Sequence, residues 1–538
     1  MPLTLTYPGV YIEEIPSSVH TITGVATSIT AFVGRAARGP VNQATVINSV
    51  GDYGRIFGGL SLLSTMSFAV QDFFLNGGGQ AIIVRLANGG SAATITLPED
   101  SSSPPPLPSS FTSLFLEAAN VGTWGRTLTA TVDHKTKTPT DSTLFNLTVQ
   151  LFDATGQQLL ATEKYLNLSV NPNDARYVPK VLAQNSQLIV VSQDATQKYK
   201  VPGIRPADTA TTTGSPPQTG PSPVGAQGGD DGSALTDNNF IGPGTQDNKQ
   251  GIYALETADL FNLLCIPPYS GDDVGTSVVA AAAKYCETKR AFYIVDPPSG
   301  WTSKATAVSQ FNDPNTDYVG TRSDHAALFF PRIKEVNPLH DGQLETFAPC
   351  GAVAGIFART DGNRGVWKAP AGQDASLTGV VQLSVPLTDA ENGELNPLGV
   401  NCLRSFPVIG RVVWGARTLQ GADQLASQWK YVPVRRTALF LEESLYRGTK
   451  WVVFEPNDEP LWAQIRLNVG AFMQTLFLQG AFQGTSAKDA YFVKCDSETT
   501  TQNDIDLGIV NIVVGFAPLK PAEFVVIQIE QLAGQIQV

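Results

Sequence analysis

The chain has 538 residues, 42% of them hydrophobic and only 16% charged, with a formal net charge of −12. At about 150 residues per domain, this length predicts three or four domains, and the apolar content excludes a disordered chain. The acidic balance argues against nucleic acid as a partner, because duplex binding needs clustered cations. No apolar run approaches the ~20 residues that a membrane helix requires, so we expect no direct membrane insertion.

The five cysteines are scattered and show no CxxC spacing, which predicts neither a zinc site nor a disulfide framework. An odd set of unpaired thiols favours a chain made in a reducing cytoplasm. The first residues carry no Lys or Arg ahead of an apolar core, so we expect no secretory signal.

The first hundred residues predict a strand, a helix and a second strand. The helix is expected over 61–76, with apolar residues along one side, and the run Gly77-Gly78-Gly79 ends it. The strands are expected at 26–33 and 81–86, and the second is a continuous apolar run typical of a buried strand.

Two segments poor in buriable side chains follow, at 100–110 and 202–250, and both are predicted to be flexible linkers. Between them, apolar and polar residues alternate, for example over 144–152 and again over 158–166. Alternation on both sides of the Asp153-Ala-Thr-Gly turn is typical of a β-hairpin. The region therefore predicts a small β-rich domain inserted into the rest of the chain.

The chain then alternates strands with helices, which predicts a partly parallel α/β sheet. The strands are expected at 261–266, 291–295 and 326–330, and the helices at 277–287 and 302–311. The C-terminal part mixes both types. It has expected helices at 435–446 and 460–478, and expected strands at 509–516 and 524–529. The fold class is thus α/β and α+β with several domains.

No constellation in the sequence resembles a reaction centre. The loop after 261–266 lacks both GxGxxG and the P-loop lysine, and its aspartates would repel a phosphate. His325 follows Asp324, but on a strand the two side chains would point to opposite faces. The carboxylates at 442, 443, 504 and 506 are read as helix-start or turn charges. We expect no catalytic, cofactor-binding or metal-ligating residue, and no HExxH spacing relates His20, His134, His325 and His340.

Each end of the chain carries an isolated β-prone segment. The first is separated from the next strand by Pro16-Ser-Ser, and the last follows Ala517-Pro-Leu-Lys-Pro, whose prolines favour extended backbone. A lone apolar strand must find a partner or it invites aggregation. Two interpretations stay open: each strand joins the sheet of its own domain, or it augments a sheet of a neighbouring subunit.

Several segments resemble the contractile tail sheath family of phages and phage-tail-like injection systems. The resemblance runs nearly end to end, and it departs from the family pattern at Arg126, where the family motif GxWGNxL has Asn. The matching motifs are YPGVYIEEIP (7–16), ITGVATS (22–28), GTWGRTL (122–128), GVWKAPA (365–371), LNPLGVN (395–401), VWGARTL (413–419), FEPNDEPLW (454–462) and PAEFVV (521–526).

The resemblance implies a structural subunit that is not an enzyme and needs no cofactor. Family sheaths stack as hexameric rings around an inner tube, exchange strands through N- and C-terminal arms, and contract to drive the tube through a target membrane. Expected partners are other copies of the chain, the inner tube protein, and the baseplate and terminal cap proteins. The particle would be assembled from a chain made in the bacterial cytoplasm, either as a virion component or as part of an injection system.

The resemblance also divides the chain. The expected parts are an N-terminal arm (1–20), an α/β core in two pieces (21–98 and 251–345), an inserted β-rich outer domain with flexible linkers (99–250), a C-terminal α+β domain facing the tube (346–516) and a C-terminal arm (517–538).

The expected strand-exchange residues are Val10, Tyr11, Ile12, Glu13, Glu14, Ile15, Phe524, Val525, Val526, Ile527, Gln528 and Ile529, and the expected hinges are Pro16, Pro518 and Pro521. Two alternatives remain: an α/β enzyme of unknown substrate, and a surface-binding module or adhesin that attaches through the insertion.

Overall fold

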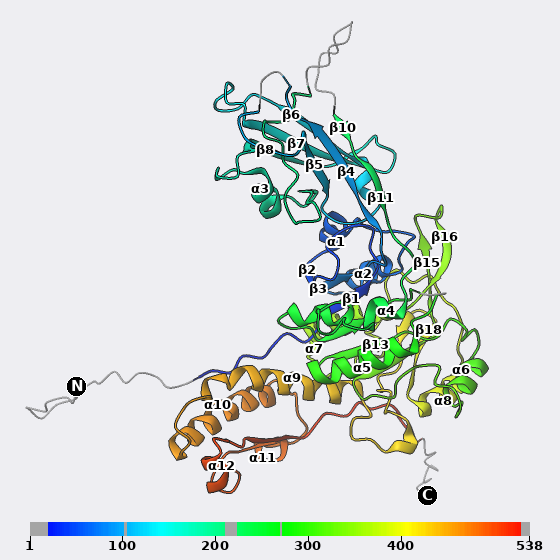
Figure 1. The fold of residues 1–538 in the computed structure, drawn as a ribbon. Helices are drawn as coiled ribbons and strands as arrows, with labels where there is room; N and C mark the ends of the chain where they lie inside the picture. Colours follow the sequence, from blue (N-terminus) through cyan, green and yellow to red (C-terminus); the bar gives the residue numbers. More distant parts are fainter. Residues whose placement is uncertain (1–19, 102–104, 210–222, 270–271, 529–538) are drawn as a thin grey trace, which may run out of the picture.

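A computed structural model describes residues 20–101, 105–209, 223–269 and 272–528. Its centre is an eight-stranded sheet in the order β19-β18-β14-β13-β12-β1-β3-β2, parallel throughout except at its two outermost pairs. This arrangement agrees with the α/β rhythm of the sequence (Figure 1). The strands are β1 (Thr30–Gly34), β2 (Thr45–Ile47), β3 (Ala81–Arg85), β12 (Leu263–Cys265), β13 (Phe292–Val295), β14 (Ala326–Phe330), β18 (Val400–Phe406) and β19 (Gly410–Val413).

The strands of the sheet are buried on both faces because helices cover each side. Phe32 and Ile83 face one core with α2 (Met66–Leu75) and α7 (Cys350–Arg364), whereas Ala31 and Ile82 face a second core with α5 (Thr276–Lys289). This alternation along each strand explains why the strand sequences are continuous apolar runs.

Helix α7 was not predicted from the sequence, because its glycines weaken the helical signal. The structure gives the reason for two of them. A Cβ added at Gly351 would lie 2.0 Å from the Ala69 carbonyl oxygen, and one added at Gly355 would lie 2.5 Å from the Phe73 carbonyl oxygen. The glycines therefore allow the backbones of α2 and α7 to touch.

A β-rich unit is inserted between β3 and α4 (Asp237–Ile241) and lies at one end of the molecule (Figure 1). Two four-stranded sheets, in the orders β10-β6-β7-β8 and β11-β4-β5-β9, enclose its own apolar core. The strands are β4 (Ser91–Pro98), β5 (Ser113–Ala118), β6 (Leu128–Asp133), β7 (Leu144–Phe152), β8 (Leu159–Ser169), β9 (Ile189–Val191), β10 (Val224–Gly225) and β11 (Gln227–Asp230); helix α3 (Val178–Asn185) packs beside them.

The segments that the sequence predicts to be flexible linkers are partly structured. β11 pairs with β4, so the unit begins before residue 99 and includes part of 202–250. The end of that same segment belongs to the α/β core, where Phe240 is fully buried. Composition misled here, because a segment poor in apolar residues can still pair through its backbone and bury a single aromatic ring.

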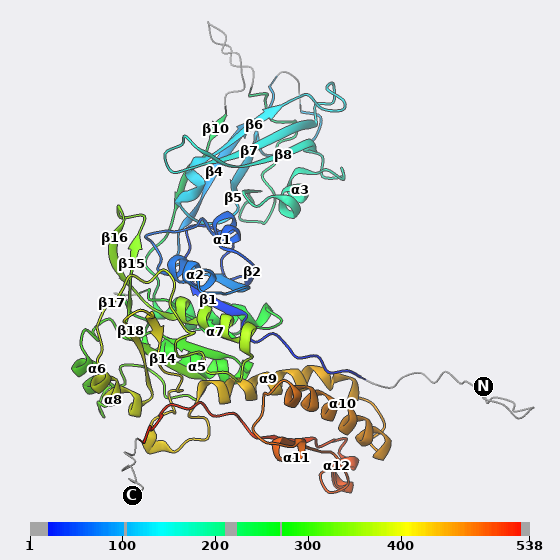
Figure 2. The same cartoon turned by 180° about the vertical axis from the view of Figure 1, so that it is seen from behind.

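The C-terminal region forms a layer at the opposite end of the molecule, as Figure 2 shows from behind. Its helices α9 (Val432–Gly448) and α10 (Glu459–Leu478) share a core with the two-stranded sheet of β20 (Tyr491–Lys494) and β21 (Val513–Phe516). α10 begins as the sequence predicts, with Asp458 as N-cap and Pro460 in the first turn.

The remaining elements connect these layers. They are α1 (Val50–Phe57), α6 (Lys304–Phe311), the antiparallel strands β15 (Ile333–Asn337), β16 (Gln343–Phe347) and β17 (Gln382–Leu383), and the short helices α8 (Asp389–Leu395), α11 (Ala487–Ala490) and α12 (Gln502–Asp506).

Candidate assembly site

The described part of the N-terminal segment lies along helix α9. The Val25 N–H donates to the Ser444 hydroxyl at 3.2 Å, and His20 stacks on Trp451 with ring centroids 4.1 Å apart. The chain therefore reaches the body of the protein beside the C-terminal end of α9. The predicted strand-exchange residues Val10 to Ile15 and the predicted hinge Pro16 lie outside the described residues.

The C-terminal segment leaves β21 and returns toward the central sheet, where Arg417 holds it. This guanidinium is fully buried and binds both Glu523 carboxylate oxygens, at 2.8 and 2.6 Å. It also donates to Asp423 at 3.0 Å, and the Tyr431 hydroxyl donates to Glu523 at 3.2 Å. A planar guanidinium matched to both carboxylate oxygens fixes the position and the direction of the chain at Glu523.

Past Glu523 the chain is exposed. The side chains of Phe524, Val525, Val526 and Ile527 are 75–82% exposed, and residues 524–528 form no strand. Within the described part of the chain, their backbone groups form no hydrogen bond. The strand predicted at 524–529 is therefore absent from the single chain, because no other strand lies beside this segment; Ile529 itself is outside the described residues.

The two predicted hinge prolines that the structure describes differ in their surroundings. Pro518 forms an isolated bridge with Phe482 and so still belongs to the C-terminal layer. Pro521 lines a groove of about 710 Å³ that the segment 519–524 shares with two tryptophans, Trp367 and Trp414.

Sequence motifs gave both halves of the Arg417–Glu523 pair but not the pair itself. The arginine lies in VWGARTL and the glutamate in PAEFVV, 106 residues apart. A buried arginine needs an anionic partner, so an arginine inside an apolar motif indicates that a carboxylate lies nearby in the fold. The sequence does not identify which carboxylate that is.

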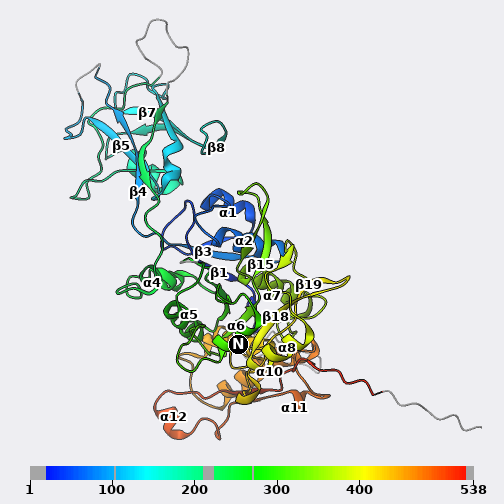
Figure 3. The same ribbon diagram turned by 90° about the vertical axis from the view of Figure 1, so that its right-hand side faces the viewer.

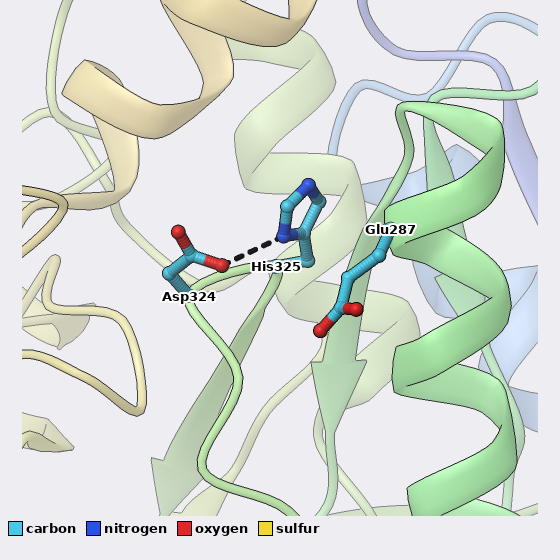
Figure 4. Close-up of side chains that lie close together, drawn as sticks. All are labelled: Glu287, Asp324 and His325. Carbon is cyan, nitrogen blue, oxygen red and sulfur yellow. Dashed lines mark hydrogen bonds and ion pairs between the residues drawn. The ribbon is translucent and has the colours of Figure 1, made fainter.

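One group of side chains has the composition of a metal site: Glu287, Asp324 and His325 (Figure 4). Asp324 and His325 precede β14 in a turn, so they meet at 2.7 Å (Nδ1 to Oδ1). The prediction that they point to opposite faces of a strand is therefore wrong.

Both nitrogens of His325 are already engaged. Nε2 lies 2.6 Å from an Arg435 nitrogen, and because arginine can only donate, Nε2 accepts and the proton is on Nδ1. Although burial alone would raise it, the pKa of Asp324 is lowered by the bond from His325 and by the Arg435 charge. A metal ion would have to displace a guanidinium, so these residues do not fit a metal.

A smaller cavity of about 250 Å³ lies at the carboxyl ends of β12 and β13. Arg332 in its wall already bonds Asp273 at 3.0 Å and the Pro297 carbonyl. Burial raises the pKa of the neighbouring Asp296 to about 6. The volume is below the ~300 Å³ of typical ligand pockets, and the carboxylates disfavour a phosphate, as the sequence predicts for this loop.

Two family profiles match the chain in the regions just described. The phage tail sheath protein central domain covers residues 242–419, and the phage tail sheath C-terminal domain covers residues 425–531. The chain belongs to the contractile tail sheath family. The resemblance read from the sequence motifs is thereby confirmed.

Individual relatives agree with this assignment. The tail sheath protein of Vibrio phage KVP40 is 29% identical over 174 residues, which cover 32% of this chain and 24% of that protein. The chain thus spans about a quarter of the length of that relative. Among the described residues, no helix is both long and apolar enough to cross a bilayer.

Solved structures extend the likeness to the whole fold. The sheath complex of an extracellular contractile injection system (PVC) in its contracted state has a TM-score of 0.56 and 21% identity, covering 98% of each chain. A chain in the structure of the anti-feeding prophage (AFP) baseplate matches with a TM-score of 0.54 and 22% identity, covering 98% of this chain and 99% of that chain. At this identity the likeness shows the fold.

Proposed function

We propose that this chain is the sheath subunit of a contractile particle, either a phage tail or an injection system. It polymerises as stacked hexameric rings around an inner tube, attaches to baseplate and terminal cap proteins, and contracts to drive the tube through a target membrane. The two matching sheath domains and the end-to-end likeness in fold to chains of injection-system structures support this proposal.

The observation that carries the proposal is the exposed apolar run at 524–527, which directly follows the Arg417–Glu523 ion pair. A segment with four exposed apolar side chains and unpaired backbone groups needs a sheet to join. The sheet of β20 and β21 has only two strands, so both of its edges are open within the described residues. The open edge of a neighbouring subunit accepts the segment as an added strand.

The described N-terminal segment runs out beside α9 (Figure 1), and the described end of the C-terminal segment extends away from the body (Figure 3). The N-terminal segment reaches it beside Trp451, ahead of α10, whereas the C-terminal segment lines the groove beside Gln479 and Gly480, just past the end of α10. We propose that Val10 to Ile15 form the complementary N-terminal strand, with Pro16 and Pro521 as hinges. Arms at opposite ends link each subunit to two different neighbours.

The proposed mechanism is mechanical and consumes no nucleotide. An extended sheath stores free energy because its packing buries fewer contacts than the contracted packing, and the difference is multiplied over many subunits. The β-rich unit lies at the far end of the molecule from the C-terminal layer (Figure 1). We therefore place the β-rich unit on the outside of the sheath and the C-terminal domain against the tube, in a particle made from a cytoplasmic chain.

The test replaces Phe524, Val525, Val526 and Ile527 together by Ser. The matched control replaces Leu159 and Leu160, which are 48% and 52% exposed on β8. Wild type and control should form ringed tubes in electron micrographs of concentrated protein. The arm variant should stay a folded monomer, because it keeps its anchor but loses the apolar strand. Tubes of normal appearance from the arm variant would overturn the proposal.

A further inference from the structure

The connection between α9 and α10 carries a fully exposed aromatic residue. Phe454 is 103% exposed and has a φ of +73°, in the left-handed region that bulky residues rarely adopt. Val453 beside it is 62% exposed. Exposed apolar residues occurring singly are common on proteins, but here two adjacent ones share one turn.

The turn is held rigidly in this shape. The Glu455 N–H donates to the Val452 carbonyl at 3.1 Å. The Asn457 side chain donates to the Ile509 carbonyl at 2.9 Å and accepts from the Trp462 indole, also at 2.9 Å. The position of Phe454 is therefore fixed before any partner binds, which reduces the entropy lost on binding. We call residues 453–455 the tip.

The tip is acidic, whereas the groove at the other end of α10 is basic and aromatic. Glu455 is exposed and forms no ion pair within the described residues. The groove is lined by Trp367 and Trp414 and by the cations Arg364, Lys368 and Lys520; the carboxylate in its lining, Glu523, is already paired with Arg417. Of these cations, Lys520 is exposed and Arg364 has only a 3.7 Å contact with the largely exposed Asp374. An apolar, acidic tip and an aromatic, basic groove are complementary in both respects.

The same chain cannot bring its own tip into its own groove. The tip lies just before the first residue of α10. Gln479, which lines the groove, lies just after the last residue of α10. A helix of 20 residues rises about 30 Å at 1.5 Å per residue. Two complementary patches held that far apart on one rigid layer can meet only between copies, and such a contact runs head to tail.

We propose that the tip of one subunit inserts Phe454 into the Trp367–Trp414 groove of the next copy, with Glu455 facing Lys520. The occupant of the groove is thus a second copy of this chain. This inference rests on the proposed sheath function and adds a rigid contact to the exchanged arms. The described N-terminal segment meets the body at Trp451, close to the tip in sequence, and residues 519–524 line the groove, so terminal segments that join two neighbours bring tip and groove together. Repeated head-to-tail contacts close into a ring or continue as a helix.

The test measures by sedimentation the concentration at which the purified full-length chain assembles, and compares this concentration between wild type and variants. Phe454→Ala should raise that concentration at least about tenfold, as expected for an aromatic anchor buried at the centre of a contact. The matched control is Val408→Ala, because Val408 is 107% exposed with a φ of +71° at the tip of the β18–β19 hairpin. The control should assemble as wild type does.

Charge reversal identifies the partner. Glu455→Lys and Lys520→Glu should each weaken assembly, and the double variant should recover most of the loss, because only the proposed contact pairs these two positions. Normal assembly of Phe454→Ala and of both single reversals would overturn the proposal. So would variants that assemble normally but no longer bind the inner tube protein, since the tip would then face the tube. A wild-type chain that never assembles would instead overturn the proposed function.

Discussion

Arg417 is the residue that fixes the course of the C-terminal segment. Its guanidinium is fully buried and depends on Glu523, with Asp423 as a second carboxylate. A buried charge that loses its partner is costly, whereas an exposed ion pair contributes little. The pair therefore acts as an anchor that keeps the exposed residues after Glu523 at one place on the surface.

Removing the carboxylate should release this anchor. Glu523→Ala should lower the free energy of unfolding by about 3 kcal/mol, at the lower end of the range for broken buried pairs because Asp423 still contacts the guanidinium. The control Glu442→Ala removes a half-exposed carboxylate 3.6 Å from Arg435 and should cost about 0–1 kcal/mol. Urea unfolding measures both. Equal effects of the two changes would contradict the anchor.

A buried pair of carboxyl groups lies between α2 and β15. Burial, and then the neighbouring Glu335, raise the pKa of Asp72 well above its ordinary value, and burial also raises the pKa of Glu335. The folded chain thus holds these protons more tightly than the unfolded chain. The stability that they contribute is complete below the unfolded-state values near pH 4 and is lost as the pH rises through the folded-state values.

Asp72→Asn removes the ionisable group and keeps its shape. Its stability should match that of wild type at pH 4 and exceed it at pH 8, because the amide cannot ionise in the buried site. Urea unfolding at the two pH values measures the difference. A variant less stable than wild type at pH 8 would mean that the carboxylate is needed in its charged form.

At the scale of the element, the contact between α2 and α7 depends on glycine. Alanine favours a helix over glycine by roughly 0.5–1 kcal/mol, but at Gly351 its Cβ would lie 2.0 Å from the Ala69 carbonyl oxygen. Overpacking of this kind costs about 1–3 kcal/mol. Gly351→Ala should therefore destabilise the chain, whereas Gly362→Ala in the same helix, with no atom within 4 Å of the new Cβ, should stabilise it. Denaturant unfolding of the pair separates the two effects.

Elements were predictable from sequence where local signals and packing agree. The apolar run at 81–86 and the start of α10 at Asp458-Glu459-Pro460 correspond to the observed elements, since burial and capping are local in origin. Helix α7 and strands β10 and β11 were missed. α7 needs the backbone of α2 beside it, and β11 needs β4, which is more than 120 residues earlier. No local pattern carries either requirement.

The sequence predicts only part of the assembly surface, for the same reason. The motif PAEFVV marked the C-terminal arm, but the strand expected there is absent because it depends on another chain. The Arg417 anchor and the Phe454 tip depend on tertiary position and on a backbone angle. Neither property can be read from residue identity.

At the scale of the whole molecule, the β-rich unit should be removable. Its two connections meet at Asn88 and Ser233, which form an isolated bridge with a 2.9 Å backbone bond. Replacing residues 90–232 by a short Gly/Ser link should therefore leave the α/β core folded. Replacing 100–250 should not, because that deletion takes Phe240 out of the core and leaves β4 without its sheet. Circular dichroism and thermal unfolding of the two deletions distinguish these outcomes.

The same deletion tests where the unit lies in the particle. If it is on the outside of the sheath, the 90–232 replacement should still form ringed tubes of smaller diameter in electron micrographs. A folded deletion variant that forms no rings would place the unit within the assembly contacts.

A cryo-electron microscopy reconstruction of the assembled wild-type chain tests the sheath function most directly. The account predicts rings of six subunits, with residues 524–528 paired as a strand on the β20–β21 sheet of a neighbouring copy. A particle in which residues 524–528 stay unpaired, or fold back onto their own subunit, would contradict it.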